Sequence, residues 1–122
     1  MNAFICTITV ATDNQKSNAM FLPRHCRGVM VACPALEDAA HTASLEVYTG
    51  TAPGFNDFSN AVLAATNDTD WTAVDTVLFT GNAAKVSSVA KDWPLGGQWI
   101  RIGVSAAQAA NKAFTLFALE GR

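Results

Sequence analysis

The sequence is short of charge. Of its 122 residues, 8 are Lys or Arg and 10 are Asp or Glu, so charged residues make up 15% of the chain, whereas about 25% is usual for a soluble domain. Basic residues gather nowhere beyond the pair Arg24 and Arg27, and the net charge is −2. A phosphate backbone would therefore meet no positive surface, and we expect no nucleic-acid partner. The surface must instead carry Ala, Thr, Ser and Asn.

Long apolar runs are also missing. Hydrophobic residues make up 50% of the chain, but polar residues interrupt them before any stretch reaches the length of a membrane span. We therefore expect a soluble protein with no membrane partner. The segment 4–10 is apolar, yet it lacks a cationic start and is interrupted by Thr7 and Thr9. It predicts a strand and not a secretory signal peptide.

The residues of common catalytic and metal sites are few. The three cysteines, Cys6, Cys26 and Cys33, cannot all pair within one chain, which predicts free, buried thiols in a reducing compartment. His25 and His41 could join two of them in a zinc set, but Cys26 and Cys33 are too widely spaced for one. Strained nucleophile turns, Gly-rich phosphate loops and dinucleotide fingerprints are missing. We expect no catalytic, cofactor-binding or metal residue, and no enzyme.

What the sequence does contain is period-two alternation of apolar residues, which is typical of half-buried strands. The expected strands cover residues 4–10, 19–22, 29–33, 43–48, a strand pair at 71–79 broken near Asp75, 84–92, 98–104 and 114–119. The continuous apolar run 29–33 predicts a central strand covered on both faces. The Ala-rich segment 105–112 is too short for a stable helix. It predicts a hairpin between the last two strands.

About eight short strands with Gly and Pro between them predict an all-β fold. We expect an antiparallel β-sandwich of the jelly-roll type, built as a single domain over residues 1–122. One segment departs from the strand pattern: Phe55, Phe58, Val62 and Ala65 fall at helical spacing. They predict one short helical excursion near residues 55–66.

Two sets of aromatic residues are candidates for binding. Phe55 and Phe58 lie in the helical excursion, which either covers its own sheet or docks on a neighbouring protein, and we take them as candidate protein-interface residues. Trp71, Trp93 and Trp99 each stand at the start of a strand or just before it. Their rings either close one end of the sandwich or form an aromatic platform for a ligand such as a sugar.

The C-terminal third carries a family resemblance. In residues 97–110 an Ile-Arg-Ile strand precedes the turn Ser-Ala-Ala-Gln-Ala-Ala, and Phe114-Thr115-Leu116 follows as a final apolar strand. This pattern resembles the small jelly-roll structural proteins of tailed bacteriophages. The strand at 45–50 and the Trp-containing segment 70–74 are similar to parts of those proteins as well.

The resemblance implies a non-enzymatic structural protein of the virion. The expected role is a capsid decoration (cement) protein that binds the outside of a phage head and stabilises it, with an accessory head or tail protein as a second placement. Its partners would be the major capsid protein or other virion proteins, and it would form a homo-oligomer, for example a trimer. It would assemble in the host cytoplasm, locate to the capsid surface and need no cofactor. The alternative function is a carbohydrate-binding or host-attachment β-sandwich module.

Overall fold

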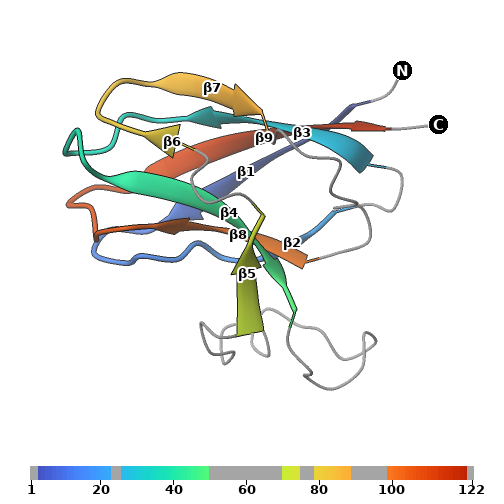
Figure 1. The fold of residues 1–122 in the computed structure, drawn as a ribbon, viewed down its shortest axis with the longest axis horizontal. Coiled ribbons are helices and arrows are strands. Elements are labelled where there is room, and N and C mark those ends of the chain that lie inside the picture. Colours follow the sequence, from blue (N-terminus) through green and yellow to red (C-terminus); the bar gives the residue numbers. More distant parts are fainter. Residues whose placement is uncertain (1–2, 23–25, 50–69, 75–78, 89–98, 121–122) are drawn as a thin grey trace.

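The computed structural model describes residues 3–22, 26–49, 70–74, 79–88 and 99–120, and its regular elements in these ranges are all β-strands (Figure 1). The predicted helical excursion near residues 55–66 lies outside them. The strands are β1 (Ala3–Val10), β2 (Met20–Phe21), β3 (Cys26–Cys33), β4 (Thr42–Tyr48), β5 (Trp71–Ala73), β6 (Phe79–Thr80), β7 (Lys85–Ser88), β8 (Trp99–Val104) and β9 (Lys112–Glu120).

The strands form two antiparallel sheets. Sheet A has the order β1-β9-β3-β7, and sheet B has the order β2-β8-β4-β5, with β6 also paired to β4. Figure 1 shows β3, β7 and β9 in one layer above β4 and β8 in the other. β5 pairs with residues 46–48 of β4 and β6 with residues 42–43, so both short strands lie along the same edge of β4.

The strand pairings are nested along the chain. β1 pairs with β9, β2 with β8, β3 with β7, and β4 with β5 and β6, while β3·β9 and β4·β8 complete the two sheets. A long antiparallel hairpin wound in this way into two sheets is the jelly roll. The predicted fold, an antiparallel β-sandwich of the jelly-roll type, is confirmed.

The core lies between the sheets and takes alternate residues from each strand, as the period-two pattern requires. In β1, for example, Ile8 and Val10 are fully buried whereas Ile5 is 60% exposed. Each buried side chain of this size contributes about 1.5–3 kcal/mol. The cluster consists of Ile8, Val10, Leu22, Val29, Val31, Cys33, Leu36, Ala43, Leu45, Val47, Val74, Phe79, Ile100, Ile102, Val104, Phe114 and Leu116.

The predicted hairpin between the last two strands is wrong. β8 lies between β2 and β4 in sheet B, while β9 lies between β1 and β3 in sheet A, so the segment joining them crosses from one sheet to the other. Gln108 holds this corner, since its buried side chain accepts a hydrogen bond from the Glu37 N–H at 2.8 Å and donates one to the Ala106 carbonyl at 2.9 Å. At this corner, hydrogen bonds of the Gln108 side-chain amide thus take the place of the backbone hydrogen bonds that would join two strands in a hairpin.

Residues 29–33 do lie in a central strand, as predicted, but the prediction that both faces of this strand are covered is wrong. β3 is a central strand between β9 and β7, but Met30 is 42% exposed. A continuous apolar run fits a strand covered on both faces, whereas each sheet of this sandwich has only one face on the core. The apolar side chains on the other face of β3 therefore point outward.

Candidate protein-interaction surface

The outward side of sheet A forms a surface that we call the A face. Its residues alternate with core residues on the same strands, and the strand register aligns them in rows, such as Ile5, Phe117 and Met30 on three adjacent strands. The described side chains of the A face are Ile5, Thr7 and Thr9 of β1, Met30 and Ala32 of β3, Val86 of β7, and Ala113, Thr115 and Phe117 of β9.

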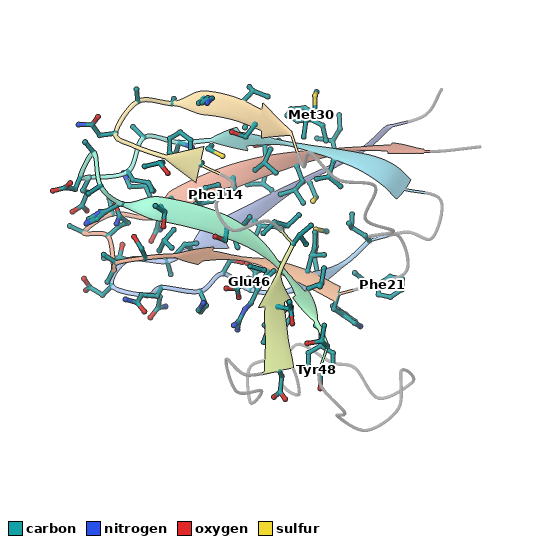
Figure 2. All side chains as sticks on the ribbon, in the orientation of Figure 1. Phe21, Met30, Glu46, Tyr48 and Phe114 are labelled. Carbon is teal, nitrogen blue, oxygen red and sulfur yellow. The ribbon has the colours of Figure 1, made fainter. Side chains whose placement is uncertain are left out.

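The A face is apolar and carries no charge among these described side chains. It holds three of the four large hydrophobic residues exposed in the described ranges: Ile5 at 60%, Met30 at 42% and Val86 at 59%. Figure 2 shows Met30 pointing away from the sandwich, whereas Phe114 lies between the sheets. Exposed apolar groups gathered in this way are typical of a surface that binds another protein.

The outward side of sheet B is different, because an ion network crosses it. Glu46 of β4 accepts from Arg101 of β8 at 2.7 Å (Oε1 to Nε) and from Lys16 at 2.9 Å (Oε2 to Nζ). The side chains of Arg101 and Glu46 are only 8% and 13% exposed, while that of Lys16 is 31% exposed. Glu46 is therefore the shared anion of one buried and one partly exposed cation.

Gly103 of β8 lies directly under this network. A Cβ at Gly103 would stand 2.7 Å from Glu46 Oε2 and 2.9 Å from Lys16 Nζ. Both distances are shorter than van der Waals contact, so a methyl group at this position would displace the ion pair. The Lys16–Glu46 pair thus runs directly over the chain of β8.

Aromatic side chains lie beside the network on the same sheet. The β2·β8 register places Phe21 opposite Trp99, with ring centroids 5.5 Å apart and edge to face. Tyr48 and Trp71 pair in the same way at 5.4 Å. The Arg101 guanidinium lies 4.4 Å from the centre of the Trp71 ring, a cation–π contact. Arg101 therefore contacts both the Glu46 carboxylate and the Trp71 ring.

The structure thus brings two of the three candidate tryptophans to one sheet. Trp71 is buried, at 7% exposure, against Arg101 and Tyr48, while Trp99 is half-buried beside Phe21. Trp93 lies outside the described residues, as do both candidate interface residues, Phe55 and Phe58. Their proposed roles stay predictions.

The described side chains include two cysteine thiols. Cys6 and Cys33 are reduced thiols, and burial raises the pKa of Cys33 to about 11 against the opposing effects of the Lys85 charge and a hydrogen bond with Ser87. A thiol with so high a pKa is a poor nucleophile. Within these ranges no three His, Cys, Asp or Glu side chains group as metal ligands, and no helix is long and apolar enough to cross a membrane.

No protein-family model matches the chain, and neither does any curated protein. Among solved structures, the mitogen derived from Yersinia pseudotuberculosis is similar over 98% of this chain and 86% of its own, at 11% identity and a TM-score of 0.45. A chain of the capsid asymmetric unit of cyanophage Pam1 is similar over 97% of this chain and 85% of its own, at 18% identity and a TM-score of 0.33. With TM-scores below 0.5, neither likeness carries an argument about function.

Reasoning from the sequence did not identify the A face. The outward residues of β1 and β9 could be recognised one strand at a time, because Thr7 and Thr115 stand between core residues in a period of two. That these strands are neighbours, and that β3 adds Met30 to the same face, follows only from the pairing. The ion network around Glu46 was missed for the same reason, since Lys16, Glu46 and Arg101 are far apart in sequence.

Proposed function

We propose that the chain is a non-enzymatic structural protein of a phage virion, a decoration (cement) protein that binds the outside of the head and stabilises it. The observation that supports this role best is the A face, whose described side chains carry no charge and on which Ile5, Met30 and Val86 are 42–60% exposed. The partner would be the major capsid protein. The sequence resemblance to small jelly-roll proteins of tailed phages favours the same role.

The A face suits binding to a shell for a physical reason. Its Thr, Ala and aliphatic side chains lose little hydration free energy on contact, since no charge has to be desolvated. A contact of modest area is weak for one molecule. When the bound molecules also contact each other on a symmetric shell, avidity strengthens the whole layer.

The test is co-sedimentation of the purified protein with heads of the parent phage that lack it. Met30→Glu places a carboxylate in the middle of the A face. Phe21→Glu is the matched control, because it makes the same change at a residue of similar exposure, 39% against 42%, on sheet B. Thermal unfolding of both variants verifies that they fold.

We expect saturable binding of the native protein at a stoichiometry that matches the symmetry of the shell. Met30→Glu should weaken it at least about tenfold, which corresponds to ~1.4 kcal/mol for an unpaired charge brought into the contact. Phe21→Glu should bind like the native protein. A native protein that does not sediment with the heads would overturn the proposed role, and equal losses in the two variants would overturn the assignment to the A face.

A second candidate function, a carbohydrate-binding or host-attachment module, is favoured by the aromatic residues of sheet B. Phe21 is 39% exposed and Trp99 is half-buried beside it, so these two rings offer some surface for stacking on a sugar. For this function, binding on a glycan array should be lost in a folded Trp99→Ala variant. Binding that persists in that variant would exclude this pair of rings.

A further inference from the structure

The strands at the edges of the two sheets differ in length. In the described ranges, β2, β5, β6 and β7 stand at edges and are two, three, two and four residues long. Short strands are one of the ways in which proteins keep sheet edges from pairing with other chains. β1 is an edge strand too, since β9 is its only partner among the described strands, but it is eight residues long.

β1 also lacks three further protections of sheet edges, namely charged residues, Pro and bulges. Its eight residues, Ala-Phe-Ile-Cys-Thr-Ile-Thr-Val, include no charge and no Pro. They pair with β9 in eight consecutive steps without a bulge, from Ala3 opposite Leu119 to Val10 opposite Lys112. A long, regular and uncharged edge presents a row of backbone donors and acceptors ready for another strand.

We infer that β1 pairs edge to edge with β1 of a second copy of this chain, in antiparallel orientation across a twofold axis, so that the two A sheets become one continuous sheet. This inference is independent of capsid binding and adds a defined contact between subunits.

A second copy is the occupant that the charge distribution favours. Around a twofold axis perpendicular to the sheet, outward residues of one β1 face outward residues of the other, and inward residues face inward ones. Because Ala3–Val10 contains no charge, no register of this pairing brings like charges together. The outward residues Ile5, Thr7 and Thr9 are β-branched, which suits cross-strand packing.

The pairing would also enlarge the A face. Each copy contributes four strands in the order β1-β9-β3-β7, so the joined sheet would run without a break from one β7 to the other. The rows that contain Ile5, Phe117 and Met30 would continue across the axis. If the A face binds the shell, one dimer would present twice the contact area, and the second half would bind at high effective concentration.

The test compares two lysine substitutions in the isolated protein by sedimentation equilibrium over a wide concentration range. Thr7→Lys puts a charge on the edge strand. Thr115→Lys is the matched control: Thr115 lies directly opposite Thr7 on β9, on the same face, but on a strand with neighbours on both sides. Thr9→Lys, at the next outward position of β1, replaces Thr7→Lys if the latter fails to fold by circular dichroism.

We expect a monomer–dimer equilibrium for the native protein. The Thr7→Lys variant should have a dimer dissociation constant at least tenfold higher than that of the native protein. Added salt should partly reverse this increase, because it screens the repulsion between the lysines of the two copies. Thr115→Lys should dimerise like the native protein. In hydrogen exchange, amides of β1 should gain protection as the concentration rises, and those of β7 should not.

Several results would overturn the inference. They are a native protein that stays monomeric up to about 1 mM, the range of very weak association, a native trimer, an equal loss of association in the two Thr variants, and concentration-dependent protection at β7 in place of β1. Capsid binding is not part of this assay, so the inference and the proposed function can fail separately.

Discussion

The carboxylate of Glu46 allows a sharp test of the energetics of sheet B. Glu46→Ala removes the partner of two cations in different surroundings: Arg101, whose side chain is 8% exposed, and Lys16, at 31%. Truncation removes the Glu46 carboxylate from beside the buried Arg101 charge, and breaking a buried pair of this kind costs about 3–5 kcal/mol. We expect the lower end, about 3 kcal/mol, because the Arg101 guanidinium keeps its contact with the Trp71 ring at 4.4 Å.

Lys16→Ala is the matched control at the other end of the same carboxylate. It leaves Glu46 paired with Arg101 at 2.7 Å and removes only the more exposed cation. Exposed ion pairs contribute about 0.2–1 kcal/mol, so the loss should stay below about 1 kcal/mol. It should also shrink in high salt, whereas the loss in Glu46→Ala should change little, since buried pairs are screened less.

The assay is urea-induced unfolding of the native protein and both variants at low and high salt. A loss of about 3 kcal/mol corresponds to a fall of about 1–3 M in the urea concentration at the unfolding midpoint. Equal losses in the two variants, or a loss below about 1 kcal/mol in Glu46→Ala, would refute the reasoning that burial of Arg101 makes Glu46 essential.

Three further predictions concern the corner, the buried thiol and the candidate interface. Gln108→Ala should lower the free energy of unfolding in urea by about 1–3 kcal/mol, because the Glu37 N–H loses its acceptor and the Ala106 carbonyl loses its donor; a loss below about 0.5 kcal/mol would contradict this interpretation of the corner. Burial raises the pKa of Cys33 from 9.0 to about 11, so the unfolded chain releases this proton at lower pH than the folded one, and stability should fall between pH 9 and 11. The stability of the Cys33→Ala variant should fall less over that interval. If the stabilities of the variant and the native protein changed with pH in parallel, the Cys33 thiol would be excluded as the cause. Phe55→Ala with Phe58→Ala should reduce binding to phage heads and leave the unfolding temperature nearly unchanged, whereas an equal loss of stability would assign both rings to the core.

Much of the fold could be predicted from the sequence because strand formation is a local property here. In β1 the side chains alternate between core and surface with a period of two. In β8 the aliphatic residues Ile100, Ile102 and Val104 alternate with Trp99, Arg101 and Gly103, and these patterns alone predicted both strands. The prediction was poorer for β3, where the apolar run Val29–Cys33 gives no alternation. An apolar run of that kind does not show whether the outer face of a strand is covered by the rest of the chain or stays exposed, and Met30 proved to be 42% exposed.

The candidate sites were predicted less well. Single aromatic residues attract notice in a sequence, so Trp71 and Trp99 were recognised, but their burial and their contacts with Arg101 and Phe21 depend on the pairing of the strands. Gln108 stands in an Ala-rich turn that looked like the tip of a hairpin. Its role became visible only when the structure placed Glu37, 71 residues away in the chain, at its side-chain oxygen.

The sequence by itself determined which residues of each strand share a side, because alternation in an extended chain depends only on backbone geometry. It also determined that the surface has little charge, since composition does not change on folding. The tertiary structure alone decided which strands are neighbours. Closing a long loop costs only slightly more than closing a shorter one, so local pattern leaves many pairings open. The nested pairing of the jelly roll therefore decided that Ile5, Met30, Val86 and Phe117 meet on one uncharged face and that β1 becomes its long edge.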